Sequence, residues 1–154
     1  LEEIGQMDKK VECLHVYREH VPNISLYEGV KDLIEQLISK GIKVGIITDG
    51  RPNGQRNKLS ALGLNDIIDD IIITDELGGE QFRKPCDIAF RIMQRKWRIP
   101  FENIVYVGDN FNKDFQAPKQ LGMQWMFINN GEGLYKSVSG GIAISMLWDH
   151  ICNK

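Results

Sequence analysis

The sequence predicts an α/β fold built on a Rossmann-like parallel sheet, and two observations support this. Four short apolar runs recur along the chain, and each is continuous rather than alternating, as in strands that helices cover on both faces. Segments with helical periodicity lie between these runs. Strands and helices that alternate in this way favour a parallel sheet with right-handed crossovers. The runs are VGIIT (44–48), IIIT (71–74), IVYV (104–107) and WMFI (125–128).

Helices are expected between these strands. Residues 30–41 (VKDLIEQLISKG) place five aliphatic side chains on one stripe and end in a glycine that can stop a helix. Pro85 is expected to open a helix within 84–97 (KPCDIAFRIMQRKW), because proline suits the first helical position. Shorter helices are expected at 55–62 and 113–121.

Length and composition indicate one globular domain. The chain has 154 residues, of which 42% are hydrophobic and 26% are charged, enough for a substantial core. A net charge of −2 offers no basic surface for nucleic acid or for a membrane, so we expect a small-molecule or protein partner. No apolar run approaches the length of a membrane-spanning helix. The three scattered cysteines show no CxxC spacing, which indicates reduced thiols and a cytoplasmic protein.

Polar residues follow the predicted strands at their carboxyl ends, where ligands bind in open α/β sheets. Lys84 adds a cation in the loop between the second and third strands, and Asp114 lies five residues beyond Asp109. A lysine, a hydroxyl and a carboxylate pair suit a phosphate and Mg²⁺. Taken singly, each group also fits an ordinary turn, cap or surface position. The strand ends read Thr48-Asp49-Gly50, Thr74-Asp75-Glu76, Gly108-Asp109-Asn110 and Asn129-Asn130.

Three of these stretches, in this order, resemble the motifs of the haloacid dehalogenase (HAD) superfamily. They are GIITDG as the hydroxyl motif, RKP as the lysine motif and VGDNFNKD as the acidic motif. The resemblance covers about residues 20–135 and implies a HAD-like core. Most members of the superfamily are Mg²⁺-dependent phosphohydrolases, so a small-molecule phosphate ester is the implied substrate.

The resemblance also implies roles for the residues that would bind phosphate. Thr48 would donate a hydrogen bond to the transferring phosphoryl group, together with the backbone N–H groups of Asp49 and Gly50. Lys84 would neutralise the nucleophile and the phosphate, and Asn110 would help to position ligands. Such a site works mainly by positioning and by electrostatic stabilisation of the transition state.

The same resemblance implies a metal site at two carboxylates. Asp109 would bind Mg²⁺ directly or through water, and Asp114 would orient the water shell of the metal. Asp75 and Glu76 match no catalytic position of the superfamily, so we expect a structural or cap-facing role for them.

The chain departs from the superfamily pattern at the nucleophile. The superfamily carries an Asp-x-Asp motif at the end of its first strand, where the first aspartate attacks phosphorus and the second acts as general acid and base. No Asp-x-Asp occurs in this sequence. We therefore expect the chain to begin partway through the domain and to be inactive alone. Residues 1–20 are expected to form a separate amphipathic helix. Residues 1–27 would be a remnant of the helical cap and linker, and residues 28–154 the core without its first strand.

Two hypotheses for function follow. The first is the C-terminal portion of a phosphohydrolase that acts on a small phosphomonoester through an aspartyl-phosphate, using Mg²⁺. The second is a non-catalytic HAD-like module at the C-terminus of a larger protein, such as one fused to an ATP-grasp domain. A metal-free dehalogenase fits poorly, because Lys84, Asp109 and Asp114 suit Mg²⁺ and phosphate. Upstream sequence would distinguish the phosphohydrolase from the module: a strand that ends in Asp-x-Asp favours the enzyme, and its absence favours the module.

The absent strand has a structural consequence. In the superfamily it lies between the strands that match 44–47 and 104–107, so its absence leaves two unpaired strand edges. We expect either that these two strands pair directly or that a segment from a second copy of the chain, as in a homodimer, or from an upstream domain completes the sheet.

Overall fold

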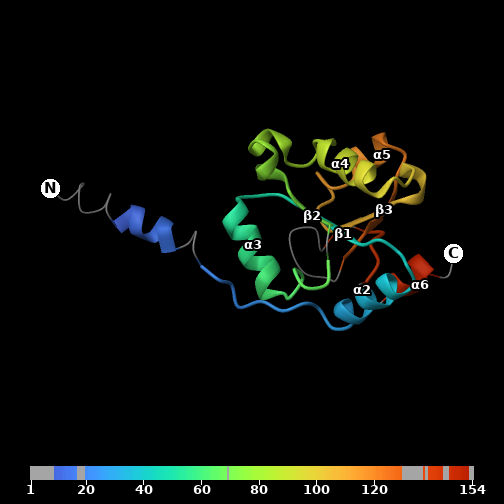
Figure 1. Ribbon diagram of the computed structural model, residues 1–154, viewed down its shortest axis with the longest axis horizontal. Helices are drawn as coiled ribbons and strands as arrows, with labels where there is room; N and C mark the ends of the chain where they lie inside the picture. Colours follow the sequence, from blue (N-terminus) through green and yellow to red (C-terminus); the bar gives the residue numbers. More distant parts are fainter. Residues whose placement is uncertain are drawn as a thin grey trace.

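The computed structural model describes residues 9–16, 20–68, 70–129, 137, 139–143 and 146–152. Residues 9–16 form a helix that stands away from the α/β body (Figure 1). The helix expected within 1–20 is thus present in part, and residues 1–8 and 17–19 lie outside the described residues. The remaining elements are α2 (Val30–Ser39), β1 (Gly45–Thr48), α3 (Pro52–Ala61), β2 (Asp70–Ile73), η1 (Thr74–Leu77), η2 (Glu80–Phe82), α4 (Ile88–Trp97), η3 (Phe101–Asn103), β3 (Val105–Gly108), α5 (Gln116–Gln120), β4 (Gln124–Phe127) and α6 (Leu147–Cys152).

All four predicted strands are present, and they form two separate pairs. β1 lies parallel to β2, with Thr48 opposite Ile73, and β3 lies parallel to β4, with Gly108 opposite Phe127. Within the described residues, β1 and β3 do not pair with each other. The expectation that these two strands pair directly is therefore wrong, and completion of the sheet by another segment stays a prediction.

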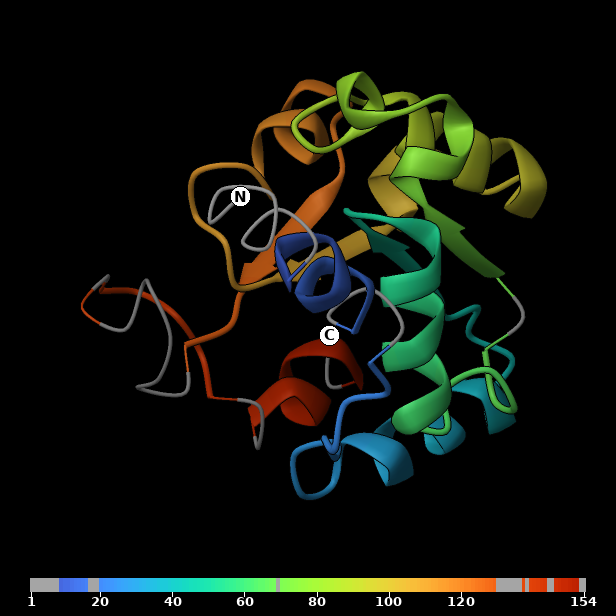
Figure 2. The ribbon, with the colours of Figure 1, turned by 90° about the vertical axis from the view of Figure 1, so that its left-hand side faces the viewer.

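Helices cover both faces of the strands, which fits the mainly apolar strand sequences, although β2 begins with Asp70 and β4 with Gln124. α4 and α5 lie on one side of the strands, and α2 and α6 lie on the other (Figures 1 and 2). Ile46 of β1 packs against a core cluster around Leu59 and Ile73, whereas the next residue, Ile47, packs against a second cluster around Phe90. Side chains alternate across a strand, so β1 contributes to the core on both faces. No helix of the described residues has the length and apolarity to cross a membrane.

The segment before α4 is a loop where the sequence predicted the first turn of a helix. Pro85 was expected to open this helix, but the helix begins at Ile88, with Asp87 at its N-cap, so that prediction is wrong. Residues 83–86 form a turn in which the Cys86 N–H donates to the Arg83 carbonyl at 2.9 Å. The Lys84 N–H meanwhile donates to the Asp49 carboxylate at 3.1 Å, so this segment is held to the end of β1. The loop therefore places Lys84 beside the strand ends.

Candidate functional site

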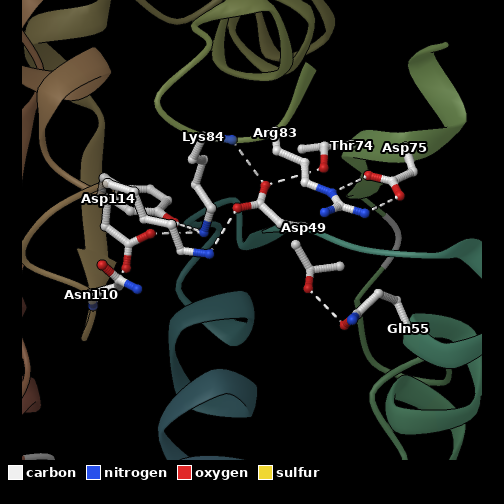
Figure 3. Close-up of polar contacts among 11 residues, drawn as sticks. Asp49, Gln55, Thr74, Asp75, Arg83, Lys84, Asn110 and Asp114 are labelled. Atoms are coloured by element: carbon white, nitrogen blue, oxygen red, sulfur yellow. Dashed lines mark hydrogen bonds and ion pairs between the residues drawn. The ribbon is translucent and has the colours of Figure 1, made fainter. Parts of the chain in front are cut away.

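The carboxyl ends of β1 and β3 carry a group of two lysines and two aspartates, which we call the carboxyl-end cluster. Asp49 follows β1, Lys84 lies in the loop before α4, and Lys113 and Asp114 lie in the turn after β3. Figure 3 shows Lys84, Asp49 and Asp114 converging from these three segments. The sequence-predicted site residues Lys84, Asp49 and Asp114 are thus within reach of one another.

Lys84 and Asp114 form a buried ion pair. The Lys84 ammonium lies 2.8 Å from Asp114 Oδ1, and the two side chains are 9% and 3% exposed. The same ammonium donates a hydrogen bond to the Tyr106 hydroxyl at 2.9 Å. Burial alone would lower the pKa of Lys84, but the Tyr106 hydroxyl and the Asp114 carboxylate raise it above its ordinary value. Lys84 is therefore a permanent positive charge at the site.

The turn after β3 is shaped around the Asp114 carboxylate. The Asn110 N–H donates to Asp114 Oδ2 at 2.9 Å, and the Asp114 N–H donates back to the Asn110 carbonyl at 2.9 Å. A Cβ atom built on Gly108 would lie 2.6 Å from Asp114 Oδ2, closer than any real contact allows. A glycine at position 108 thus lets the carboxylate fold back against the strand end.

Asp49 connects three other segments through its carboxylate. Its Oδ1 accepts hydrogen bonds from the Thr74 hydroxyl, at the end of β2, and from the Lys84 N–H, both at 3.1 Å. Its Oδ2 lies 3.0 Å from the ammonium of Lys113. The Asp49 side chain thus organises the loops, while the resemblance assigns phosphate binding to its backbone N–H.

Thr48 and Gly50 lie beside Gln55 of α3. The Thr48 hydroxyl donates to Gln55 Oε1 at 2.9 Å. Gly50 has φ of 129°, and a Cβ atom there would meet the Gln55 amide nitrogen at 2.8 Å. The glycine therefore allows both the backbone turn after β1 and the close approach of the Gln55 side chain.

Asp109 and Asn110, in the turn that leads to Asp114, carry side-chain oxygens of the kind that a hard cation prefers. Asp109 is exposed, and Asn110 Oδ1 is buried without a hydrogen-bond donor among the described residues. The described part of the chain contains no group of three or more acidic, histidine or cysteine side chains suited to a metal. Mg²⁺ commonly keeps several waters and takes only one or two carboxylates plus substrate phosphate. The oxygen donors of Asp109, Asn110 and Asp114 fit this requirement.

The remaining acidic residues of the rim are engaged in ion pairs. Arg83 donates two hydrogen bonds of 2.7 Å to the Asp75 carboxylate, and these bonds hold the pKa of Asp75 below its ordinary value. Arg56 pairs with Glu76. These contacts favour the structural role expected for the two acids.

Three residues of the site were not identified from the sequence. Tyr106 is part of an apolar strand run, Lys113 has the composition of a surface turn, and Gln55 lies on a short polar helix. Tyr106 and Lys113 contact residues 22 and 64 positions away in the chain, and Gln55 contacts Thr48 seven positions away across the turn before α3. No local sequence pattern reports such contacts. For Lys113 alone, the sequence offered a hint of a role in the site, because this lysine directly precedes Asp114 in the acidic motif.

Comparison with known proteins identifies the class. The family described as "Haloacid dehalogenase-like hydrolase" matches residues 1–128. The chain therefore belongs to the haloacid dehalogenase-like hydrolase family, as its three motifs indicated.

Individual relatives are phosphatases. The chain is 31% identical over 132 residues to a glyceraldehyde 3-phosphate phosphatase of Methanocaldococcus jannaschii, covering 84% of this chain and 57% of the relative. It is 25% identical over 132 residues to a phosphoserine phosphatase of Thermus thermophilus, covering 85% and 52%. The crystal structure of a HAD phosphatase from Thermococcus onnurineus superimposes with a TM-score of 0.69 at 28% identity, covering 84% and 59%. The chain thus spans about half the length of the curated relatives that it matches.

Proposed function

We propose that the chain is the C-terminal portion of a Mg²⁺-dependent phosphohydrolase and carries the phosphate-binding and metal-binding part of its site. The intact protein would act on a small phosphomonoester through an aspartyl-phosphate. The observation that carries this proposal is the placement of a buried lysine and of the Asp109–Asp114 turn at adjoining strand ends in a HAD-like chain. That the relatives are named as phosphatases supports it.

Each site residue has a proposed task. Thr48 and the N–H groups of Asp49 and Gly50 would donate hydrogen bonds to the phosphoryl oxygens, after the Thr48 hydroxyl leaves Gln55. Lys84 would supply a fixed positive charge, which stabilises negative charge on the oxygens in the transition state.

The metal would lie beside the turn after β3. Asp109, Asn110 and Asp114 would hold Mg²⁺ or its water shell, and the bound ion would supply charge neutralisation for the phosphoryl oxygens. Since the Asp114 carboxylate already pairs with Lys84, its expected role is to orient water rather than to be a sole ligand.

The nucleophile would come from outside this sequence, which contains no Asp-x-Asp. We propose that residues 1–27 belong to the cap and linker, that residues 28–154 belong to the core, and that an added strand lies between β1 and β3. Sedimentation equilibrium, which measures the mass in solution, tests whether another chain or domain supplies the added strand. A homodimer, or a stable complex with an upstream domain, is the expected result, whereas a stable monomer with a continuous sheet would contradict it.

Activity measurement tests the proposal for the chain alone. With Mg²⁺ and an aryl phosphate, we expect no release of phosphate by the 154-residue chain, because the attacking carboxylate is absent. The matched arm is the same chain extended upstream by its natural sequence, which we expect to be active if that sequence contains Asp-x-Asp. Turnover by the chain alone that disappears on Asp109→Asn would overturn the assignment of the nucleophile to another segment.

The second candidate is a non-catalytic HAD-like module of a larger protein, such as one with an ATP-grasp domain. The lack of Asp-x-Asp is the observation that favours it. An upstream sequence without that motif, together with an inactive full-length protein, would support the module over the phosphohydrolase.

A further inference from the structure

The two lysines of the carboxyl-end cluster differ in how tightly they are held. Lys84 is 9% exposed and has two partners, the carboxylate of Asp114 and the hydroxyl of Tyr106. Lys113 is 39% exposed and, among the residues that the structure describes, forms one ion pair, with Asp49 at 3.0 Å. Lys84 is therefore fixed within the protein, whereas the Lys113 side chain reaches solvent. Because the Asp49 carboxylate is only 8% exposed, Lys113 leaves it at small cost only if the other hydrogen bonds of Asp49 persist and an anion takes up the lysine charge.

Asp49 accepts two hydrogen bonds besides the one from Lys113. Its other oxygen accepts from the Thr74 hydroxyl and from the Lys84 N–H. Its carboxylate stays anchored at the end of β1 even when the lysine leaves. The Lys113 ammonium thus rests on a fixed acceptor beside the strand end where the Thr48–Gly50 backbone would meet a phosphate.

Without a metal ion, the aspartates and lysines of the site carry a formal net charge of −1, which the proposed Mg²⁺ would offset. Asp49, Asp109 and Asp114 carry three negative charges, and the two lysines carry two positive charges. A phosphate group adds further negative charge to this group. Because the Lys84 ammonium is already shared between Asp114 and Tyr106, Lys113 is the described lysine of the cluster that can offer its full charge to an incoming anion.

We infer that Lys113 is a second cationic ligand of the phosphate group and exchanges the Asp49 carboxylate for a phosphate oxygen when phosphate binds. This inference rests on the proposed function and extends it to a residue of the VGDNFNKD motif to which the resemblance assigns no role. In the absence of phosphate, the Lys113–Asp49 pair keeps the cation in place. The alternative is a purely structural contact between the turn after β3 and the end of β1.

The test is calorimetric titration of inorganic phosphate into the 154-residue chain in the presence of Mg²⁺. We expect Lys113→Gln to weaken binding about tenfold, as for the loss of one charged hydrogen bond. Lys113→Arg should restore most of the affinity, and Lys58→Gln, an exposed lysine of α3, should leave it unchanged. Affinity that is unchanged in Lys113→Gln, with only the thermal stability lowered, would show a structural contact and overturn the inference.

A second experiment measures the competition between the Asp49 carboxylate and phosphate for the Lys113 ammonium. Asp49→Asn keeps an oxygen for Thr74 and for the Lys84 N–H but removes the charge that holds Lys113. We expect it to tighten phosphate binding about two- to five-fold, and to have a smaller effect in a chain that also carries Lys113→Gln. Effects that simply add would overturn the exchange.

The Lys84→Gln variant separates this inference from the proposed function. Loss of binding in Lys84→Gln with no change in Lys113→Gln would overturn the role of Lys113 and leave the phosphate site in place. Absence of phosphate binding by the unaltered chain would overturn both.

Discussion

Two groups of charged side chains lie at opposite ends of the parallel strands, and they differ in the polar residues that lie around them. At the amino end of β2, Asp70 pairs with Lys96 and accepts a hydrogen bond from the Trp97 indole; we call these three residues the amino-end cluster. A Cβ atom on Gly45 of β1 would meet the Trp97 ring at 2.8 Å, so the indole closes this end of the strand pair. At the other end, Asp109 is exposed and Asn110 Oδ1 has no donor among the described residues.

The difference shows that a partly buried lysine–aspartate pair is weak evidence for a functional site. Both clusters contain one. What distinguishes the carboxyl-end cluster is its position at the strand ends, where backbone N–H groups and turns are available for ligands, and its second lysine. The amino-end cluster has the contacts of a structural group that joins α4 to β2.

The largest expected effect is the loss of the buried cation at the carboxyl-end cluster. Lys84→Met should destabilise the chain by about 3–5 kcal/mol, because it leaves the Asp114 charge buried and unpaired. It should also abolish phosphate binding. Urea unfolding and calorimetry measure the two effects. Adding Asp114→Asn should recover much of the stability without restoring binding; recovery of both would contradict the role of Lys84 as a phosphate ligand.

Gly108→Ala tests the shape of the turn beside Asp114. The added methyl group would meet the carboxylate at 2.6 Å and displace it, so we expect a loss of about 1–3 kcal/mol in unfolding free energy and weaker binding of phosphate with Mg²⁺. Gly54→Ala in α3 is the matched control, since its Cβ atom would meet nothing within 4 Å. A stability loss in the control as large as in Gly108→Ala would remove the steric explanation.

Asp70→Asn perturbs the amino-end cluster alone. At pH 7 we expect a loss of about 1–2 kcal/mol in unfolding free energy and unchanged phosphate affinity. Burial alone would raise the pKa of Asp70, but the hydrogen bonds from Lys96 and Trp97 outweigh it and hold that pKa below its ordinary value of 3.8. The carboxylate therefore stabilises the fold above the unfolded pKa, and this contribution is lost as the pH falls through the folded pKa.

Urea unfolding at several pH values from 7 to 2 measures this dependence. The difference between the unaltered chain and Asp70→Asn should shrink as the pH falls below about 4. A difference in unfolding free energy that stays constant down to pH 2 would contradict the proposed stabilisation by the Asp70 carboxylate. A change in phosphate affinity in Asp70→Asn would contradict a purely structural role for the amino-end cluster.

The smallest effect is expected at the exposed ion pair between Arg56 and Glu76, which lies near the carboxyl ends but outside the cluster. Arg56 is 64% exposed, so Arg56→Ala should change the unfolding free energy by no more than about 1 kcal/mol. Phosphate affinity should stay within about twofold. A tenfold loss of affinity would extend the phosphate site to this pair.

The strands could be predicted because the sequence contains four short apolar runs, as expected where helices cover both faces of a sheet, and each run overlaps an observed strand. Thr48, Asp109 and Asn110 could then be placed at a common rim, since they directly follow such runs. The start of α4 was predicted wrongly: a local preference of Pro85 for a helix start was overridden by the turn at 83–86 and its bond to Asp49.

The contacts of Tyr106, Lys113 and Gln55 could not be predicted for a different reason. The contacts of Tyr106 and Lys113 depend on the meeting of segments far apart in the sequence, such as Asp49 and Lys113, which are 64 positions apart. The Thr48–Gln55 bond spans seven positions and depends on how α3 turns back beside the end of β1. A tyrosine in a strand and a lysine in a turn have ordinary packing and solvent roles by default. Only the three-dimensional arrangement shows that these two side chains contact the lysine and the aspartate of the motifs.

The most direct test of the central claim is an amide NMR titration of the 154-residue chain with inorganic phosphate in the presence of Mg²⁺. Our account predicts chemical-shift changes at the amides of residues 48–50, 84 and 109–114, and none at residues 70, 96 and 97. Shifts confined to the amino-end cluster, or no shifts at phosphate concentrations far above the physiological range, would contradict it.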